Sequence, residues 1–224
     1  MTRTQPFPSM RRLVIVAALA LGLSGLAIAL TPGTHEHDAL AASRTSRAVF
    51  HDGMRALWED HIVWTRMVIV SAADDLPDLP TAVDRLLRNQ DQIGDAIKPF
   101  YGEAAGEQLS SLLREHIVVA ADILTAAKAG DTAGVDTAAA AWYANGDAIG
   151  TFLADANPRQ WDRAEMQAMM RDHLDLTLAE AVARLEGRYV DDAAAYDEIH
   201  VQILHMADML SDGIIAQFPG QFAR

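Results

Sequence analysis

Three histidines recur along the chain in nearly the same local sequence. His61, His116 and His173 each follow an acidic residue, in the strings EDHIVWT, REHIVVA and RDHLDLT, at steps of 55 and 57 residues. Each lies at helical spacing from apolar residues on both sides, which predicts that its imidazole enters the protein interior. Three neutral imidazoles that converge suit Zn²⁺ or copper and leave a fourth coordination position open.

Other polar residues interrupt the apolar stripes between and after these histidines. Together with the histidines they follow one another at steps of 28, 27, 29, 28 and 27 residues, and the midpoint of each step falls on a turn-forming segment. In an antiparallel pair of helices, residues equidistant from the turn face each other at the same height. We therefore expect one polar layer across the protein, made of His61, Asn89, His116, Asn145, His173 and His200.

This layer predicts a buried polar site with two kinds of member. The predicted metal ligands are His61, His116, His173 and His200, and a water could take the place of the last. The carboxamides, together with an acid two helical turns beyond the third histidine, are predicted to orient the ligands or to contact a small ligand. The supporting set is Asn89, Asn145 and Glu180. The acid equally fits an ion pair at the flank of its helix.

A structural role for the layer competes with ligand binding. Histidine and asparagine both donate and accept hydrogen bonds, so pairs across a hairpin would satisfy each other and set the helix register. A small organic ligand is a third alternative, and a metal-dependent enzyme with a three-histidine site and an activated water is a fourth. The acids beside the histidines turn about 100° or more away from them, unlike the carboxylates of di-iron bundles. Because no phosphate-binding loop or nucleophile motif is present, a binding module is favoured over an enzyme.

A methionine-rich group presents the same choice between function and packing. Five methionines and a histidine fit a Cu(I) site, because thioethers and imidazoles suit that ion. Methionine at helical spacing is more often core packing. The residues are Met166, Met169, Met170, Met206, Met209 and His205.

Helical periodicity and helix breakers organise the rest of the chain. Stretches with Pro, Gly, Asn or Asp separate six helical segments, and no segment alternates with a period of two. Short connections make sequential helices antiparallel neighbours, so we predict an all-α, up-and-down bundle of six helices. The spacing fits three repeated hairpins of about 56 residues, or six helices that merely share one length. The predicted helices span 47–73, 81–101, 104–129, 132–155, 163–186 and 191–217.

The first thirty residues are predicted to lie outside this bundle. Arginines precede the uncharged run LVIVAALALGLSGLAIAL, and Thr-Pro-Gly follows it, which is the pattern of an export signal or a membrane anchor. Ala-x-Ala patterns at 27–29 and 39–41 favour cleavage, whereas a run of 18 residues is long enough to remain as an anchor. Either alternative puts the body outside the cytoplasm, secreted or anchored to the cytoplasmic membrane through residues 13–30. The predicted division is a signal peptide or anchor over 1–30, a polar linker over 31–47 and the bundle over 48–222.

Charge and cysteine content exclude several classes of partner. The chain has 31 acidic against 18 basic side chains and a formal net charge of −13, which disfavours nucleic acid and anionic lipid. It has no cysteine, so disulfides, thiolate metal sites and haem attachment through cysteine are excluded. The expected partners are a metal ion, a small ligand and, if the N-terminal run is retained, the membrane. The composition carries no indication of oligomeric state.

Four strings resemble a family of small bacterial all-helical proteins of uncharacterised activity: LWEDHIVWTR, LLRNQDQIGDAIKPFYG, AWYAN and ILHMADMLSDGIIAQFP. The resemblance covers about residues 50–222 and implies the fold. His61, Asn89 and Asn145 lie within these strings, and His200 lies three residues before the last of them. Members carry transferred names, glycosyltransferase among them, but sugar-nucleotide transferases generally need an α/β domain and no strand pattern occurs here. The resemblance therefore supplies no activity.

These observations predict an exported or membrane-tethered helical module that binds or senses a metal ion or small ligand at its buried layer. The competing hypotheses are a structural cell-envelope protein, whose layer only sets helix register, and the metal-dependent enzyme. Buried neutral histidines also predict that stability falls below about pH 6, because the unfolded chain binds protons with a histidine pKa near 6.5.

Overall fold

The computed structural model describes residues 32–223, which form six α-helices and a short terminal 3₁₀ turn. No strand occurs within these residues, so the prediction of an all-α fold is confirmed for this part of the chain. The elements are α1 (Pro32–Ala73), α2 (Leu79–Tyr101), α3 (Glu103–Ala129), α4 (Thr132–Ala156), α5 (Arg163–Leu185), α6 (Tyr189–Gln217) and the turn η1 (Pro219–Phe222).

Local sequence signals explain where the helices begin and end. The side chain of Asp131 accepts a hydrogen bond from the backbone N–H of Gly134 and caps α4. Asp162 caps α5 in the same way, and both satisfy backbone donors that a helix start leaves free. Helix α3 ends at Gly130, whose φ of 70° lies in the left-handed region that glycine adopts without strain.

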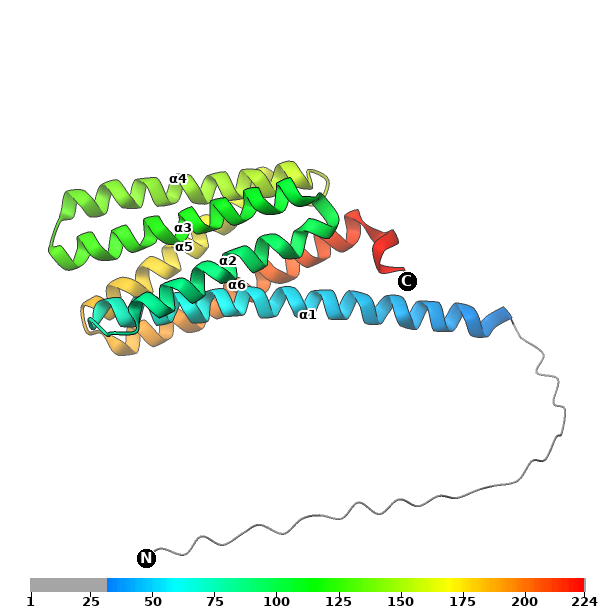
Figure 1. The fold of residues 1–224 in the computed structure, drawn as a ribbon, viewed down its shortest axis with the longest axis horizontal. Coiled ribbons are helices and arrows are strands. Elements are labelled where there is room, and N and C mark those ends of the chain that lie inside the picture. The colour runs from blue at the N-terminus through cyan, green and yellow to red at the C-terminus, as the bar shows by residue number, and fades with distance from the viewer. Residues whose placement is uncertain (1–31, 224) are drawn as a thin grey trace, which may run out of the picture.

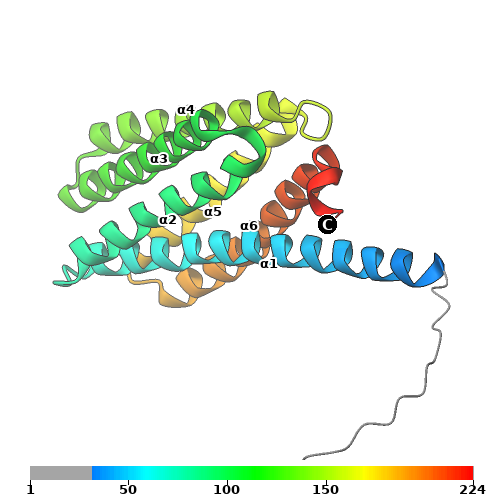
Figure 2. The same cartoon turned by 45° about the vertical axis from the view of Figure 1, so that its right-hand side comes forward.

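The six helices form a closed ring in which each packs against its neighbours in sequence. The last helix, α6, packs against α1 and closes the ring (Figures 1 and 2). Connections of a few residues link the helices and place successive ones side by side. The predicted six-helix bundle is therefore confirmed.

Helix α1 is longer than the sequence pattern indicated. Residues 32–47, predicted to be a polar linker, continue α1 without a break, and this part projects beyond the other helices (Figure 1). The physical reason is that Pro32 and Gly33 fall in the first helical turn, where they are tolerated, and the stretch from 34 to 47 contains no glycine or proline. The C-terminal turn holds α1 where it enters the bundle, through contact of Phe50 with Phe222.

The predicted export signal or anchor, residues 1–30, lies outside the described residues. None of the helices within residues 32–223 combines the length and apolarity that crossing a bilayer requires.

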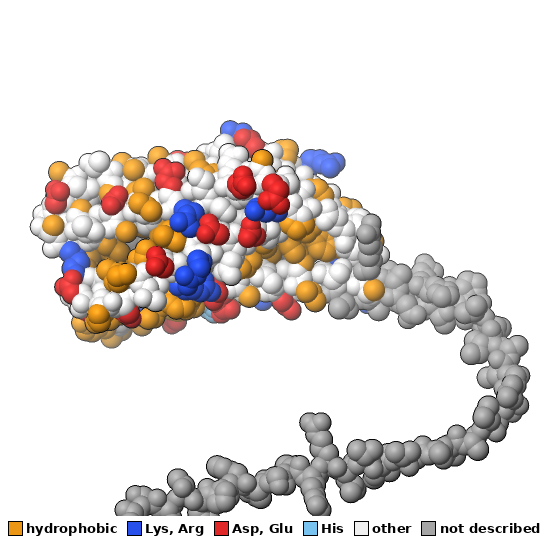
Figure 3. Space-filling view, viewed as in Figure 1, with side chains coloured by type: hydrophobic (Ala, Val, Ile, Leu, Met, Phe, Trp, Pro, Cys, Tyr) orange, Lys and Arg blue, Asp and Glu red, His pale blue; other side chains and the backbone are white. Residues whose placement is uncertain are grey.

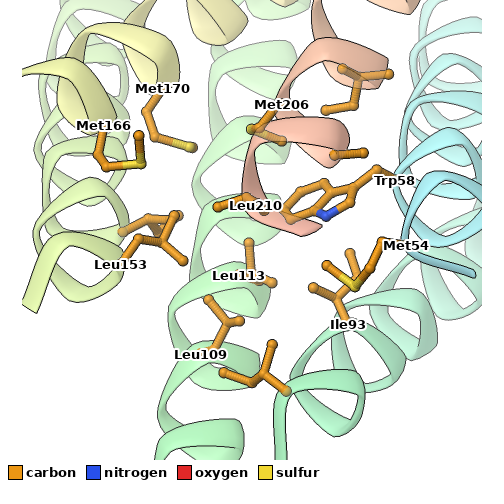
Figure 4. Packing of buried hydrophobic residues seen from close by; sticks show 14 of the residues in the cluster. Met54, Trp58, Ile93, Leu109, Leu113, Leu153, Met166, Met170, Met206 and Leu210 are labelled. Carbon is orange, nitrogen blue, oxygen red and sulfur yellow. The ribbon is translucent and has the colours of Figure 1, made fainter. Parts of the chain in front are cut away.

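The core repeats the same layers on α1, α3 and α5. Each of the three histidines is preceded by two large apolar side chains. One lies seven residues before the histidine and the other lies three residues before it. None of the six is more than 3% exposed, and Figure 4 shows them directed into the space between the helices. At roughly 2 kcal/mol for each fully buried large side chain, this stack is a main source of stability. The two layers are Met54, Leu109 and Met166, and Trp58, Leu113 and Met170.

Glycines allow two helix pairs to approach closely. A Cβ on Gly94 of α2 would lie 2.5 Å from the carbonyl oxygen of Gly106 on α3. A Cβ on Gly150 of α4 would lie 2.9 Å from the backbone nitrogen of Gln167 on α5. These contacts fix the separation of the helices between successive hairpins. Outside the core, acidic and basic side chains are interspersed on the face shown in Figure 3.

Candidate functional site: the histidine layer

His61, His116 and His173 lie in the bundle interior, one each on α1, α3 and α5. They are 2%, 3% and 4% exposed. The ring centroids of His61 and His173 are 5.7 Å apart, with 43° between the ring planes. The ring of His116 lies against Trp142 of α4, at 5.1 Å between centroids and 30° between planes. The three imidazoles thus come from three different hairpins into one interior region.

Each imidazole is anchored at Nδ1 by a carboxamide from the following helix. In all three hairpins the carboxamide lies 29 residues after its histidine. The equal offsets show that all three hairpins place the histidine and its carboxamide in the same way. Six unrelated helices would have no reason to share this offset. The pairs and their N···N or N···O distances are His61 with Gln90 (3.2 Å), His116 with Asn145 (2.9 Å) and His173 with Gln202 (3.2 Å).

The carboxamides are themselves held by backbone carbonyls one helical turn before each histidine. Asn145 Nδ2 donates to the carbonyl of Leu112 at 3.1 Å, and Gln202 Nε2 donates to that of Met169 at 3.2 Å. In the first hairpin the corresponding carbonyl, that of Leu57, accepts instead from Asn89 at 2.9 Å. Because the amides are fixed in this way, the orientation of each imidazole is fixed too.

The hydrogen bonds also set which ring nitrogen carries the proton. The amide oxygens of Asn145 and Gln202 can only accept, so His116 and His173 are protonated at Nδ1 and their Nε2 lone pairs are free to bind. The first hairpin differs, because Gln90 directs its NH₂ group at Nδ1 of His61, which therefore carries its proton on Nε2. None of the hydrogen bonds within residues 32–223 involves Nε2 of these three histidines.

The difference at Gln90 has a local cause. Its Nε2 also donates to the carbonyl of Leu86 at 2.8 Å and to Oδ1 of Asn89 at 3.1 Å, so reversing the amide would place oxygen against oxygen. As a result Gln90 Oε1 is buried and has no hydrogen-bond partner in the described part of the chain. An unsatisfied buried acceptor is costly, so the first hairpin holds the least relaxed part of the layer.

Burial keeps all three imidazoles neutral. It lowers the pKa of His116 to about 3 and that of His173 to about 4, and it lowers the pKa of His61 well below the usual value of 6.5. Repulsion from charged His173 contributes to the lowered pKa of both His61 and His116, and repulsion from charged His116 contributes to that of His61. Hydrogen bonds from the carboxamides act in the opposite direction but are smaller. The neutral form is the one that binds metal ions.

His200, predicted to be the fourth ligand, does not belong to the layer. Its side chain is 39% exposed and its Nε2 lies 2.9 Å from Oε1 of Glu59 on the surface. The inward face of α6 at this height is formed by Ile199 and Ile203, which are 2% and 0% exposed. One residue along a helix turns the side chain by about 100°, so His200 is rotated out of the bundle. The expectation for His200 was wrong.

Neither Asn89 nor Glu180 contacts one of the three buried histidines. Asn89 is buried, but it binds the carbonyl of Leu57 and the amide of Gln90 rather than a histidine. Glu180 is 1% exposed, and its Oε1 lies 2.5 Å from Nη1 of Arg66. That guanidinium also lies 2.7 Å from Oδ1 of Asp192. Glu180 therefore belongs to an ion-pair cluster of α1, α5 and α6, two turns along α5 from the layer.

The pKa of Glu180 is raised to about 7, because the effect of burial, with a smaller contribution from nearby Asp192, outweighs the lowering by Arg66. Of the two environments for Glu180 that the sequence left open, the ion pair at the helix flank is the one observed.

Sequence reasoning missed Gln90 and Gln202. The signal that identifies them is the offset of 29 residues, which Asn145 already has from His116. The expected height alone selects Asn89 and His200 instead. Long glutamine side chains reach the layer from positions that the helical stripe alone does not mark.

The methionine-rich group does not assemble as a copper site. Met166, Met170 and Met206 are buried in the packed core (Figure 4), while His205 is exposed on the outer side of α6. Adjacent residues on a helix point in different directions, so the histidine cannot join the sulfur atoms inside. These methionines pack the core, as the alternative interpretation held.

As the side chains stand, no group of three or more His, Asp or Glu within residues 32–223 is arranged so that it could hold a metal ion. Comparison with known proteins adds no assignment, because no protein-family model, curated protein or solved structure matches the chain. The functional proposal therefore rests on the geometry of the histidine layer.

Proposed function

We propose that this protein is an exported or membrane-tethered binding module that takes up a transition-metal ion, Zn²⁺ or copper, at His61, His116 and His173. The observation that carries the proposal is the set of three buried, neutral imidazoles, each anchored at Nδ1 and with no hydrogen-bond partner at Nε2 within the described residues. Anchoring of Nδ1 by a fixed polar group is the usual arrangement around metal-binding histidines.

Two of the imidazoles already have suitable spacing. Two rings bound through Nε2 to one Zn²⁺ place their centroids roughly 5 to 5.5 Å apart, given Zn–N bonds of about 2.1 Å. His61 and His173 are 5.7 Å apart, so a small inward movement suffices. His116 needs a larger movement, because its ring has to leave the face of Trp142.

Binding also requires a proton shift on His61. In the metal-free arrangement its Nε2 carries the proton, because Gln90 donates to Nδ1. Transfer of the proton to Nδ1 would free Nε2. The Gln90 amide would then have to rotate to the acceptor position that Asn145 and Gln202 already have, which requires it to move away from the carbonyl of Leu86 and Oδ1 of Asn89. The unsatisfied Gln90 Oε1 is placed to accept that proton's hydrogen bond after a rotation of the amide.

The repeated hairpins support a single origin for the site. The 29-residue offset and the matching core layers recur in each hairpin, and the contact of that carboxamide with the carbonyl one turn before the histidine recurs in the second and third. We propose that three hairpins arose by duplication and brought three equivalent imidazoles to one axis. The N-terminal apolar run, if it directs export, places this site outside the cytoplasm.

A purely structural layer is the second candidate, and the Gln90 contact favours it. That contact sets His61 in the tautomer opposite to the one a metal needs, and the ring of His116 is stacked rather than free. In that case the layer only fixes helix register in an envelope protein, and the family resemblance is equally compatible with it.

Metal analysis separates the two candidates. The full chain, purified without a polyhistidine tag, is measured for bound metal and titrated with Zn²⁺ and Cu²⁺ by calorimetry. We expect one ion per chain, lost in His173→Gln and retained in His200→Gln, because the second histidine lies on the surface. Absence of binding in the folded wild type, or equal binding by both variants, would overturn the metal proposal and leave the structural one.

A further inference from the structure

A small cavity lies one helical turn beyond the histidine layer, on the side away from the packed stack of methionine, leucine and tryptophan. Its volume is about 40 Å³. Its walls repeat from hairpin to hairpin, with residues four and eight positions after each histidine. These are Thr65, Ala120 and Thr177, and Ile69, Leu124 and Ala181.

The cavity exists because the side chains above the layer are smaller than those below it. Below the histidines the equivalent positions hold Met, Leu and Trp. Above them, Ala120 faces two threonines, and Ala181 shares its level with Ile69 and Leu124. Since the helices are held at fixed separations by their close contacts, the backbone does not collapse to fill the difference.

The chemistry of the walls selects an apolar guest. The hydroxyls of Thr65 and Thr177 donate to the carbonyls of His61 and His173, each at 2.8 Å, so they offer no free donor. None of the lining residues is charged. A water needs two to four polar partners, and apolar cavities stay dry.

One polar group in the wall is without a partner. Trp142 is 3% exposed, and its indole N–H has no acceptor within residues 32–223. A guest with one weak acceptor atom could satisfy this donor.

The volume of the cavity limits the size of the guest. A void of about 40 Å³ exceeds the ~10 to 15 Å³ that one water needs. It is too small for ring compounds such as benzene, which bind in a cavity of about 150 Å³.

We propose that this cavity is a binding site for a neutral, apolar molecule of about two to four heavy atoms, in the class of dissolved gases and short hydrocarbons. The site is separate from the three Nε2 atoms and does not require a metal ion. The cavity site therefore stands or falls independently of the metal proposal.

Xenon under pressure is the probe, and methyl NMR of the full chain is the readout. Ile69, Ile117 and Ile123 line the cavity, whereas Ile93, Ile149 and Ile203 lie in the packed core and serve as internal references. We expect saturable shifts of the lining methyl groups and no saturable shift of the references. Shifts that are absent, or that rise without saturation in both groups alike, would overturn the proposal.

Filling the cavity provides the matched test. Ala120→Val and Ala181→Val each place two methyl groups in the wall, and Ala179→Val adds the same groups at an exposed position of α5. We expect both filling variants to lose at least tenfold in xenon affinity, while Ala179→Val retains it. Two different positions are used so that a fold defect in one variant does not decide the result, and melting curves identify such a defect. Xenon binding that persists in a folded filling variant would show that the guest lies elsewhere.

Discussion

Two buried polar regions of this protein are built on opposite principles. The histidine layer is neutral, occurs three times and pairs imidazoles with carboxamides. The cluster of Arg66, Glu180 and Asp192 is charged and occurs once. The positions equivalent to Arg66, five residues after each of the other two histidines, hold Ala121 and Leu178. The histidine–carboxamide pair is therefore a feature of the repeated hairpin. The charged cluster is a feature of the single interface between α1, α5 and α6.

The two regions also respond to pH with opposite sign. The folded-state pKa values of the histidines are lowered, so the unfolded chain binds their protons more readily as the pH falls below 6.5. The folded-state pKa of Glu180 is raised to about 7, so the folded chain binds that proton more readily as the pH falls from 7 toward 4.5. Acid therefore destabilises the protein through the layer and stabilises it through the cluster.

The largest expected effect comes from removing Arg66, the cation that contacts both buried carboxylates of the charged cluster. Glu180 and Asp192 are both 1% exposed. Arg66→Met leaves Glu180 without its cation and leaves Asp192 only the longer contact with Arg184, at 3.7 Å. We expect a loss of about 3 to 5 kcal/mol in the free energy of unfolding at pH 8, as is typical when one member of a buried ion pair is removed. Urea denaturation measures this loss.

The matched control is Arg163→Met, because the Arg163 and Asp155 side chains are 57% and 62% exposed. Its expected cost is below about 1 kcal/mol. Equal costs for the two variants would show that the Arg66 cluster behaves as an ordinary surface pair.

The pH response of the metal-free wild type is the second prediction. Each histidine removes about 1.4 kcal/mol per pH unit below 6.5, so three remove about 4 kcal/mol between pH 7.5 and 5.5. Glu180 offsets about 2 kcal/mol of this over the same range, which leaves a net loss of about 2 kcal/mol. The measurement is urea denaturation at pH 7.5, 6.5 and 5.5.

Glu180→Gln sharpens this test, because removing the opposing group should steepen the loss toward the full 4 kcal/mol or so. A free energy of unfolding that stays level from pH 7.5 to 5.5 in this variant contradicts the burial of neutral histidines.

The third prediction tests whether the hairpins are equivalent. Asn145→Leu leaves the Nδ1–H of His116 and the carbonyl of Leu112 without partners. We expect a cost of about 1 to 2 kcal/mol. Gln202→Leu breaks the corresponding contacts of His173 and Met169 and should cost the same within about 0.5 kcal/mol. A cost that appears in only one of the two variants argues against a repeated, equivalent pair.

Much of the fold follows from short-range physics and could be read from the sequence. Asp131, Asp162 and Gly130 mark helix ends by capping and by left-handed backbone geometry, and these effects act within a few residues. The constant helical rise then brings His61, His116 and His173 to one interior region. Local signals and a fixed rise per residue are sufficient for that result.

Long-range packing decided the remaining features. His200 was expected on the inward face of α6, but contact with α1 and α5 placed Ile199 and Ile203 there instead. Glu180 was ambiguous for the same reason, because its partner Arg66 lies 114 residues away in sequence. The length of a glutamine side chain let Gln90 and Gln202 reach histidines that their helix positions did not predict.

What the sequence determined by itself is therefore the set of helices and the height of the three imidazoles, since both depend on local backbone geometry. Only the tertiary structure decided the rotation of each helix about its axis and the partners of its polar side chains. A turn of about 100° per residue means that a small rotation of a helix exchanges a buried position for an exposed one, and the packing of neighbouring helices sets that rotation.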